Sequence, residues 1–329
     1  MYMIWRCPRC RGILFEVDDG VRCKFCASHY ESIGGIPDLR LPGASGIDYD
    51  TDKANARRLL VETVGFSVEE LLRYVYSSGL HWGDRVNLRI RQIMAAPDRL
   101  RTELRGWLKP STTGVGLFLD VGCGFGTLLA AAAAEGLKGI GIDVSMVSLV
   151  VTRRLVAEWG GQPLLAAALA EALPLADGSV SGVVSLDVLE HVADQGRYLS
   201  EINRVTAPGG YVALSTPNRY SLAAEPHVFV LGVGWLPRSL QKDYVKWRSG
   251  KSYEFTWLLS AREVANLLRQ HTHFQFDILV PPVPEEEIVH FPTYRATLAR
   301  LYNRLVFSGW MRWLLLRIGP FFHIIGKKT

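Results

Sequence analysis

Four of the five cysteines lie within the first 26 residues, as two pairs with C-x-x-C spacing. Cys7 and Cys10 form the first pair, Cys23 and Cys26 form the second, and twelve residues separate the pairs. Two such turns joined by a short hairpin can direct four thiolates at one ion, as tetrahedral Zn²⁺ requires. The alternatives are unrelated thiols or a redox-active pair, but a redox motif has one pair beside a βαβ unit. The spacing therefore predicts one structural zinc ion.

A glycine-rich turn, Asp120–Gly126, follows an apolar strand and precedes an alanine-rich helix. Gly122 and Gly124 allow the backbone of a tight turn to approach a ligand closely. Asp120 places a carboxylate beside them, which could attract the amino or sulfonium group of a cationic methionine moiety. Cys123 is expected to permit close packing in this turn rather than to take part in chemistry.

A second acidic residue, Asp143, ends the next predicted strand and is followed by Val144. A carboxylate at this place in a βαβ unit can accept both hydroxyl protons of a ribose. Asp143 lies 23 residues after Asp120, a separation that suits one βαβ step. The two motifs together predict a nucleotide-binding site.

Four later segments share the order of a known family. The order resembles the class I S-adenosylmethionine-dependent methyltransferases, and in particular the small-molecule O-methyltransferases of the ubiquinone pathway. The segments that carry it are Glu171–Ser179, Ser185–Val192, Ala207–Tyr211 and Ser215–Asn218. The resemblance is close over residues 110–220 and loose over 221–329. It implies S-adenosylmethionine as cofactor and a Rossmann-like, seven-stranded α/β sheet with helices on both faces.

The resemblance also implies which residues contact the donor. Where the family often has an aspartate that meets adenine, this chain has Leu169. Adenine is therefore expected to contact the backbone of Ala170 and the side chain of Glu171. The full donor set is Asp120, Gly122, Cys123, Gly124, Asp143, Val144, Ala170, Glu171 and Asp187.

Methyl transfer to a hydroxyl requires alignment and removal of a proton, so a base is expected near the donor. The candidates are His191, Glu190 and His227. The resembling O-methyltransferases carry a similar Leu-Glu-His segment beside the acceptor. We place His191 at the start of a helix, whose N-terminus would lower the pKa of the imidazole. The alternative is that His191 only caps or packs that helix.

The acceptor is narrowed by motifs that this chain lacks. Asp187–Glu190 stands where amine-directed nucleic-acid methyltransferases carry an Asn/Asp-Pro-Pro-Tyr segment, and no cysteine nucleophile lies near this strand. We therefore expect transfer to an oxygen of a small molecule, sugar or lipid. One alternative is a tRNA or rRNA methyltransferase. Another is a non-catalytic scaffold, but the intact glycines of the turn argue against a scaffold.

Three segments are expected to position these residues. Residues 1–41 form a zinc ribbon that resembles the short activator proteins of tRNA, rRNA and protein methyltransferases, which implies a docking surface. Residues 42–109 form a polar connector, over 42–57, and a helical cap, with a helix over 86–108 broken at Pro97. Residues 110–329 alternate strands with helices, as in a parallel sheet, and hold a helical insertion near 285–318.

Composition sets limits on partners and location. The chain is 48% hydrophobic and 21% charged, with a net charge of +5 that is not gathered in one basic run. Nucleic-acid binding is therefore not established by charge. With no signal peptide and no long apolar run, we expect a cytoplasmic protein. The tail could pack as a lid or contact a membrane, because apolar residues alternate with arginines at 295, 300, 304, 312 and 317.

Overall fold

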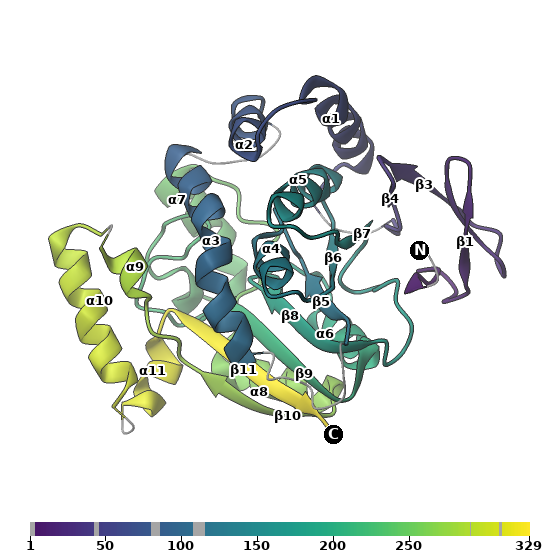
Figure 1. Cartoon of the computed structure of the whole chain (residues 1–329). Coiled ribbons are helices and arrows are strands. Elements are labelled where there is room, and N and C mark those ends of the chain that lie inside the picture. Colours follow the sequence, from purple (N-terminus) through teal and green to yellow (C-terminus); the bar gives the residue numbers. More distant parts are fainter. Residues whose placement is uncertain (1–3, 43–45, 80–85, 108–115, 290, 309–310) are drawn as a thin grey trace.

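The computed structural model describes residues 4–42, 46–79, 86–107, 116–289, 291–308 and 311–329 (Figure 1). The sequence also predicts a loop over 110–116, and most of it lies outside these ranges. The domain boundary predicted at 109–110 and Trp310 of the tail lie outside them as well. Figure 1 places the N-terminal unit and the tail helices on opposite sides of the molecule.

The N-terminal unit is a small antiparallel sheet in the order β1-β2-β3-β4. Its strands are β1 (Leu14–Val17), β2 (Gly20–Cys23), β3 (His29–Ile33) and β4 (Ile36–Pro37). Beyond β4, Asp38 forms a parallel bridge with Ala167 of the large sheet, and the Leu39 N–H donates to the Ala167 carbonyl at 2.8 Å. The unit is therefore continuous with one edge of the main fold.

The main sheet has seven strands in the order β10-β11-β9-β8-β5-β6-β7. The five strands from β9 to β7 pair in parallel, whereas β11 is antiparallel to both of its neighbours. The strands are β5 (Phe118–Val121), β6 (Gly139–Asp143), β7 (Leu164–Ala167), β8 (Val180–Leu186), β9 (Thr206–Pro217), β10 (Phe274–Leu279) and β11 (Phe321–Lys328). The predicted Rossmann-like α/β architecture is confirmed.

Strand β9 departs from the prediction at its start. The sequence predicts this strand over 211–215, after a turn that begins at Pro208, but Thr206 already pairs with Val180 of β8. The register between the strands shifts between Val180 and Gly182, so the intervening residues are accommodated as an irregularity.

Helices cover both faces of the sheet and build two apolar cores. One core collects α1 (Tyr49–Glu62), α2 (Val68–Ser77), α3 (Val86–Trp107), α4 (Thr127–Ala134) and α5 (Met146–Glu158). The other lies against α6 (Gln195–Val205) and α8 (Ala261–His271) and also includes Trp5 of the N-terminal unit.

Helix α3 corrects the predicted break at Pro97, because it runs through that residue without interruption. An internal proline costs about 3 kcal/mol, since one backbone hydrogen bond is lost. Here Ile90, Leu100 and Leu104 are buried in the core shared with α4, on both sides of the proline. Tertiary packing therefore outweighs the local penalty.

The predicted polar connector is also partly wrong. Helix α1 begins at Tyr49, and the Asp48 side chain caps it by accepting from the Thr51 N–H at 2.7 Å. The sequence of this helix has no clear apolar stripe, which is the usual signal of a helix that packs on a core. Only three of its residues are buried, and they are Asp52, Ala56 and Leu59.

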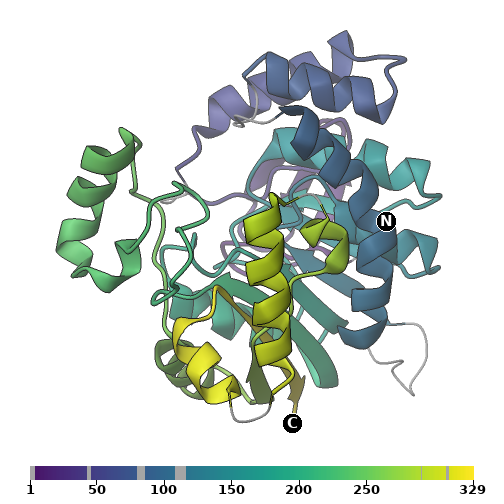
Figure 2. The same ribbon diagram turned by 90° about the vertical axis from the view of Figure 1, so that its left-hand side faces the viewer.

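The remaining helices follow β9 and surround β10. They are the short 3₁₀ turn Val233–Trp235, α7 (Arg238–Ser249), α9 (Glu285–Ile288), α10 (Thr293–Val306) and α11 (Arg312–Ile318). In Figure 2 the yellow-green α10 lies in front of the sheet. It buries Ala296 and Ala299, while Leu298 and Leu301 are exposed.

Among the described residues, no helix combines the length and apolar character needed to cross a membrane.

Candidate functional site

The four N-terminal cysteines converge on one point. Their Sγ atoms all lie within 4.8 Å of one another, with 3.6 Å between Cys7 and Cys26 and 3.4 Å between Cys10 and Cys23. Thiolates around one tetrahedral zinc, each about 2.3 Å from the ion, lie about 3.8 Å apart. A disulfide requires about 2.05 Å, and all four cysteines are free. The cluster therefore fits a four-thiolate metal site.

The backbone around the cysteines is shaped to present the thiolates. Arg11 and Ala27, each directly after a cysteine pair, adopt left-handed backbone angles, with φ of 60° and 57°. These two turns bend the chain so that both thiolates of a pair face inward. The Tyr30 hydroxyl lies 3.1 Å from Cys7 Sγ, as an outer partner that orients a ligand.

Six of the nine predicted donor residues line a cavity of about 340 Å³ at the carboxyl ends of the central strands. That volume is in the range of sites for small organic ligands. Gly122, Asp143, Val144, Ala170, Glu171 and Asp187 of the predicted set line it, together with Leu169, Val188, His191 and Phe255. The remaining predicted residues, Asp120, Cys123 and Gly124, do not line the cavity but lie in the strand end and turn below it.

The glycine turn is held to the second acidic residue. Gly122 has φ of 73°, and a Cβ there would lie 2.2 Å from Val188 Cγ2, so only glycine fits. The Asp143 carboxylate accepts from the Gly124 N–H and from the Ser145 N–H, both at 2.8 Å. The turn after β5 and the loop after β6 are therefore fixed to each other through Asp143.

Two lining carboxylates have partners that the sequence did not indicate. Glu171 Oε1 accepts from the Ala193 N–H at 2.9 Å, ahead of α6. Asp187 has φ of 56°, and its Oδ1 accepts from the Ser215 hydroxyl at 2.7 Å. A strained backbone at a strand end is typical of functional sites. The adenine contact predicted for Glu171 remains a prediction.

Asp120 is buried, and its environment disfavours charge. Burial, with a further contribution from the negative charge of Asp143, raises the pKa of Asp120 to about 8. Cys123 is also buried, and burial raises the pKa of its thiol well above the ordinary value. A protonated thiol is a poor nucleophile, which agrees with a packing role for Cys123.

Two histidines meet beside this cavity, which His191 lines. The Nε2 atoms of His191 and His227 lie 2.9 Å apart. Each Nδ1 faces an acceptor: the Phe255 carbonyl at 3.0 Å for His191, and Glu225 Oε1 at 2.5 Å for His227. Both Nδ1 atoms therefore carry hydrogen, and the two Nε2 lone pairs face each other. One proton between them relieves this repulsion, so the pair is a proton acceptor.

The two imidazoles are tuned in opposite directions. Burial lowers the pKa of His191, and the neighbouring His227 lowers it further. Burial also opposes charge on His227, but the hydrogen bond and charge of Glu225 outweigh it and raise the pKa. His191 lies in the turn before α6, which begins at Gln195. The expected helix N-terminus is therefore not the cause of its lowered pKa.

Glu190 is a third titratable residue beside the two histidines. It is fully buried, its Oε2 accepts from the Thr216 hydroxyl at 2.9 Å, and its Oε1 has no hydrogen-bond partner among the described residues. Burial, with the charge of Asp187, raises the pKa of Glu190 to about 7. Its Oε1 lies 3.9 Å from both Nε2 atoms. Two imidazoles and a carboxylate in this arrangement could also hold a divalent cation.

Sequence reasoning missed two residues of this site. Phe255 lines the cavity and fixes His191 through its carbonyl, but it lies in a stretch without a motif. Glu225 orients His227, and its position two residues before a candidate histidine was the available signal. His191 and His227 are 36 residues apart, so only the fold shows that they touch.

The central part of the chain is similar in sequence to known methyltransferases. Residues 119–214 match the family model of a methyltransferase domain. A ubiquinone biosynthesis O-methyltransferase of Sinorhizobium medicae is 32% identical over 150 residues, which cover 45% of this chain and 60% of the relative. The enzyme of that name in Brucella anthropi is 36% identical over 124 residues, 36% of this chain and 49% of the relative. The chain thus spans about half the length of these relatives.

Solved structures with a similar arrangement are more distant in sequence. An S-adenosylmethionine-dependent methyltransferase from Mesorhizobium loti has 20% identity and a TM-score of 0.48, covering 69% of this chain and 96% of that one. Haemonchus contortus phosphoethanolamine N-methyltransferase 2 has 20% identity and a TM-score of 0.47, covering 70% of this chain and 52% of that one.

Proposed function

We propose that this chain transfers a methyl group from S-adenosylmethionine to an oxygen of a small-molecule, sugar or lipid acceptor. The observation that carries the proposal is one cavity lined by both Asp143 and His191. Asp143, which is predicted to bind the ribose, and His191, the predicted base, therefore line the same cavity. The methyltransferase domain match over 119–214 and the names of the relatives support the same chemistry.

In this proposal the residues bind, align and remove a proton. Gly122 and Asp143 would hold the donor in the cavity that His191 also lines. Bound there, S-adenosylmethionine would supply an electrophilic methyl group for transfer to the acceptor oxygen, with a neutral thioether as the leaving group. The hydroxyl proton passes to the His191–His227 pair, which Glu225 and the Phe255 carbonyl orient. Alignment and general-base catalysis are the two contributions expected of such a site.

The acceptor class can be tested directly with labelled donor. Phenols, simple sugars and lipid-linked saccharides should be compared with tRNA and rRNA as methyl acceptors. We expect label in a small-molecule or lipid fraction. RNA that binds through its phosphates should bind less tightly as the salt concentration rises. Because such binding does not distinguish tRNA from other RNA, RNA affinity alone would not identify the methyl acceptor. Label that enters only tRNA or rRNA would overturn the proposed acceptor class.

Replacing Asp143 by alanine should weaken donor binding by about 1–3 kcal/mol, because hydrogen bonds to a charged group are lost. This corresponds to roughly a 5- to 150-fold rise in the dissociation constant. Isothermal titration with S-adenosylhomocysteine measures it. The exposed Asp243 of α7 offers a control, since Asp243→Ala removes an equal charge from a residue that does not line the cavity. Unchanged affinity in Asp143→Ala would contradict the assignment of the ribose ligand.

Donor binding should release a proton from Asp120 near pH 7. In the free protein the pKa of Asp120 is raised to about 8, so the carboxyl is mostly protonated at pH 7. A cationic ligand nearby favours the charged form and lowers this pKa. Affinity for S-adenosylmethionine should therefore rise from pH 6 toward pH 8.

Calorimetry in buffers with different ionisation enthalpies measures this proton. The ligand's own amino group has an ordinary pKa of about 7.7–8.0, so binding it as a cation takes up a proton rather than releasing one. Asp120→Asn should abolish the release. Equal binding enthalpies in phosphate and Tris at pH 7 would show that Asp120 does not respond to the donor.

We also propose that Cys7, Cys10, Cys23 and Cys26 bind one structural Zn²⁺. The spacing of the four sulfur atoms and the paired left-handed turns support it. Zinc in such a closed site supplies folding free energy and no open position for chemistry. Its role would be to hold residues 4–41 in shape against the main sheet.

A further inference from the structure

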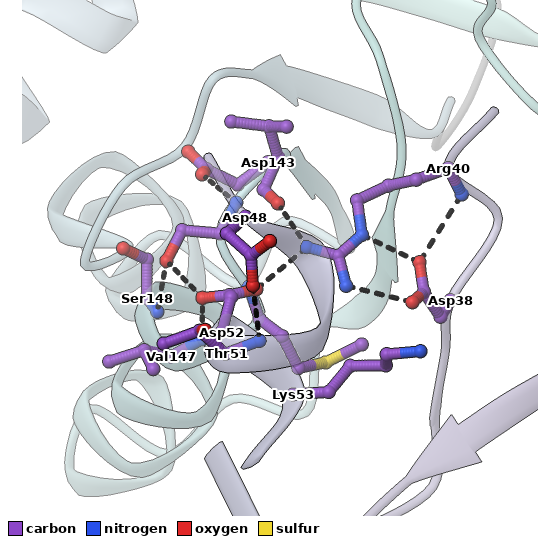
Figure 3. Close-up of polar contacts among 12 residues, drawn as sticks. Asp38, Arg40, Asp48, Thr51, Asp52, Lys53, Asp143, Val147 and Ser148 are labelled. Carbon is purple, nitrogen blue, oxygen red and sulfur yellow. Dashed lines mark hydrogen bonds and ion pairs between the residues drawn. The ribbon is translucent and has the colours of Figure 1, made fainter. Parts of the chain in front are cut away.

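A buried arginine joins the N-terminal ribbon to the main fold (Figure 3). The Arg40 side chain is 1% exposed and lies three residues after the end of β4 at Pro37. Its Nε and Nη2 donate to the two carboxylate oxygens of Asp38, each at 2.7 Å. Its Nη1 donates to Asp52 Oδ2 at 2.7 Å and to the Val144 carbonyl at 2.9 Å. The guanidinium thus links the ribbon, α1 and the loop after β6.

Asp52 carries this linkage to the start of α5. Its Oδ2 accepts from the Met146 N–H at 2.7 Å, and its Oδ1 accepts from the Val147 N–H at 3.3 Å. The Ser145 hydroxyl donates to the same Oδ1 at 3.2 Å. A carboxylate at the N-terminus of a helix satisfies backbone N–H groups that have no partner within the helix. A residue of α1 therefore caps a helix that begins 94 residues later.

The loop held in this way begins with Val144 and directly follows Asp143, the last residue of β6, and both residues line the proposed donor cavity. Arg40 holds the carbonyl of Val144, and Asp52 holds the two N–H groups that follow Ser145. Asp143 lies directly before them. The direction of its carboxylate depends on where this loop lies, because one oxygen accepts from the Ser145 N–H.

The ribbon also contacts the loop after β7, which contains the residues predicted to meet adenine. The Arg6 N–H donates to the Pro174 carbonyl at 2.8 Å, and Trp5 forms an antiparallel bridge with Leu175. Arg11 lies 3.3 Å from Glu201, whose other oxygen accepts from the Leu173 N–H at 2.9 Å. The ribbon therefore contacts both loops that form the predicted nucleoside half of the cavity.

We propose that Arg40, acting through Asp52 and Val144, is a positioning residue for the ribose carboxylate of Asp143. The ribbon is then a structural part of the donor site in the same chain, in addition to any docking role. This inference rests on the proposed donor. It predicts that the loss of Arg40 selectively weakens the recognition of ribose hydroxyls.

The test compares two ligands, S-adenosylhomocysteine and its 2′,3′-dideoxy analogue, by calorimetry on the full chain. Arg40→Gln should bind S-adenosylhomocysteine at least tenfold more weakly than the unaltered protein. The dideoxy analogue should bind both proteins within twofold, because it lacks the hydroxyls that Asp143 would hold. Arg57→Gln is the matched control, since Arg57 also joins α1 to the ribbon, through Glu31, but both side chains are about half exposed.

Asp52→Asn is a second variant, which keeps the size of the side chain and serves if Arg40→Gln does not fold. It should show the same ligand selectivity as expected for Arg40→Gln. In both variants turnover at saturating donor should change less than the donor KM. Equal loss of both ligands, or unchanged binding of S-adenosylhomocysteine, would overturn the proposal. If the unaltered protein does not bind S-adenosylhomocysteine, the proposed donor itself is wrong.

Discussion

Replacing His191 by alanine is expected to lower turnover by about 10²- to 10⁴-fold, the usual contribution of a positioned base. Donor affinity should change by less than about threefold, well under 1 kcal/mol, because the proton comes from the acceptor and not from the sulfonium. The imidazole is held for this task. Its Nδ1 is fixed by the Phe255 carbonyl, and its Nε2 lies 2.9 Å from His227.

The measurement is single-turnover transfer of labelled methyl to the best acceptor, beside calorimetry of S-adenosylhomocysteine binding. His227→Ala should also lower turnover, because it removes the second half of the proton acceptor. His273, an exposed histidine beyond α8, is the control, and His273→Ala should behave as the unaltered protein. Turnover within fivefold of normal in His191→Ala would remove this residue from the reaction.

Replacing Cys10 by serine is expected to abolish stoichiometric zinc and to unfold the ribbon. Metal binding contributes about 10–16 kcal/mol to the folding of small zinc modules, far more than a sheet of this size can gain from its core. Cys10 is exposed, so the substitution leaves no cavity in the interior. The remaining three thiolates cannot close the site.

Elemental analysis of protein purified without chelator should give about one zinc per chain, and about none for Cys10→Ser. Hydrogen exchange should become fast over β1 to β4 and stay slow in β5 and β8. Cys123→Ala is the control, because Cys123 is buried in the main core, outside the four-cysteine cluster. A full zinc content in Cys10→Ser, or none in the unaltered protein, would contradict the four-thiolate site.

The sequence predicted those parts of the site that lie within one βαβ unit. The turn Asp120–Gly126 and the strand end at Asp143 have a fixed spacing, and Asp143 does end β6, as the sequence predicts. Such local motifs can be recognised in the sequence because each glycine or carboxylate contacts a residue of the same βαβ unit. The cysteine pairs are readable for the same reason.

The remaining parts depend on contacts between distant segments. Asp52 lies in a helix with no apolar stripe, and its partners at the start of α5 are 94 and 95 residues away. Arg40 gave no signal, because an isolated arginine is usually exposed. Pro97 misled the prediction because local propensity argued for a break where tertiary packing maintains the helix.

The bridge from Asp38 and Leu39 to Ala167 has a consequence for how copies of this chain behave toward one another. Strand β7 ends the order of the large sheet, and an edge strand offers its N–H and C=O groups to any extended segment that approaches. The protein's own residues 38 and 39 occupy part of that edge. Residues 38 and 39 of the ribbon thus leave less of this edge open to strand addition by a second copy of the chain.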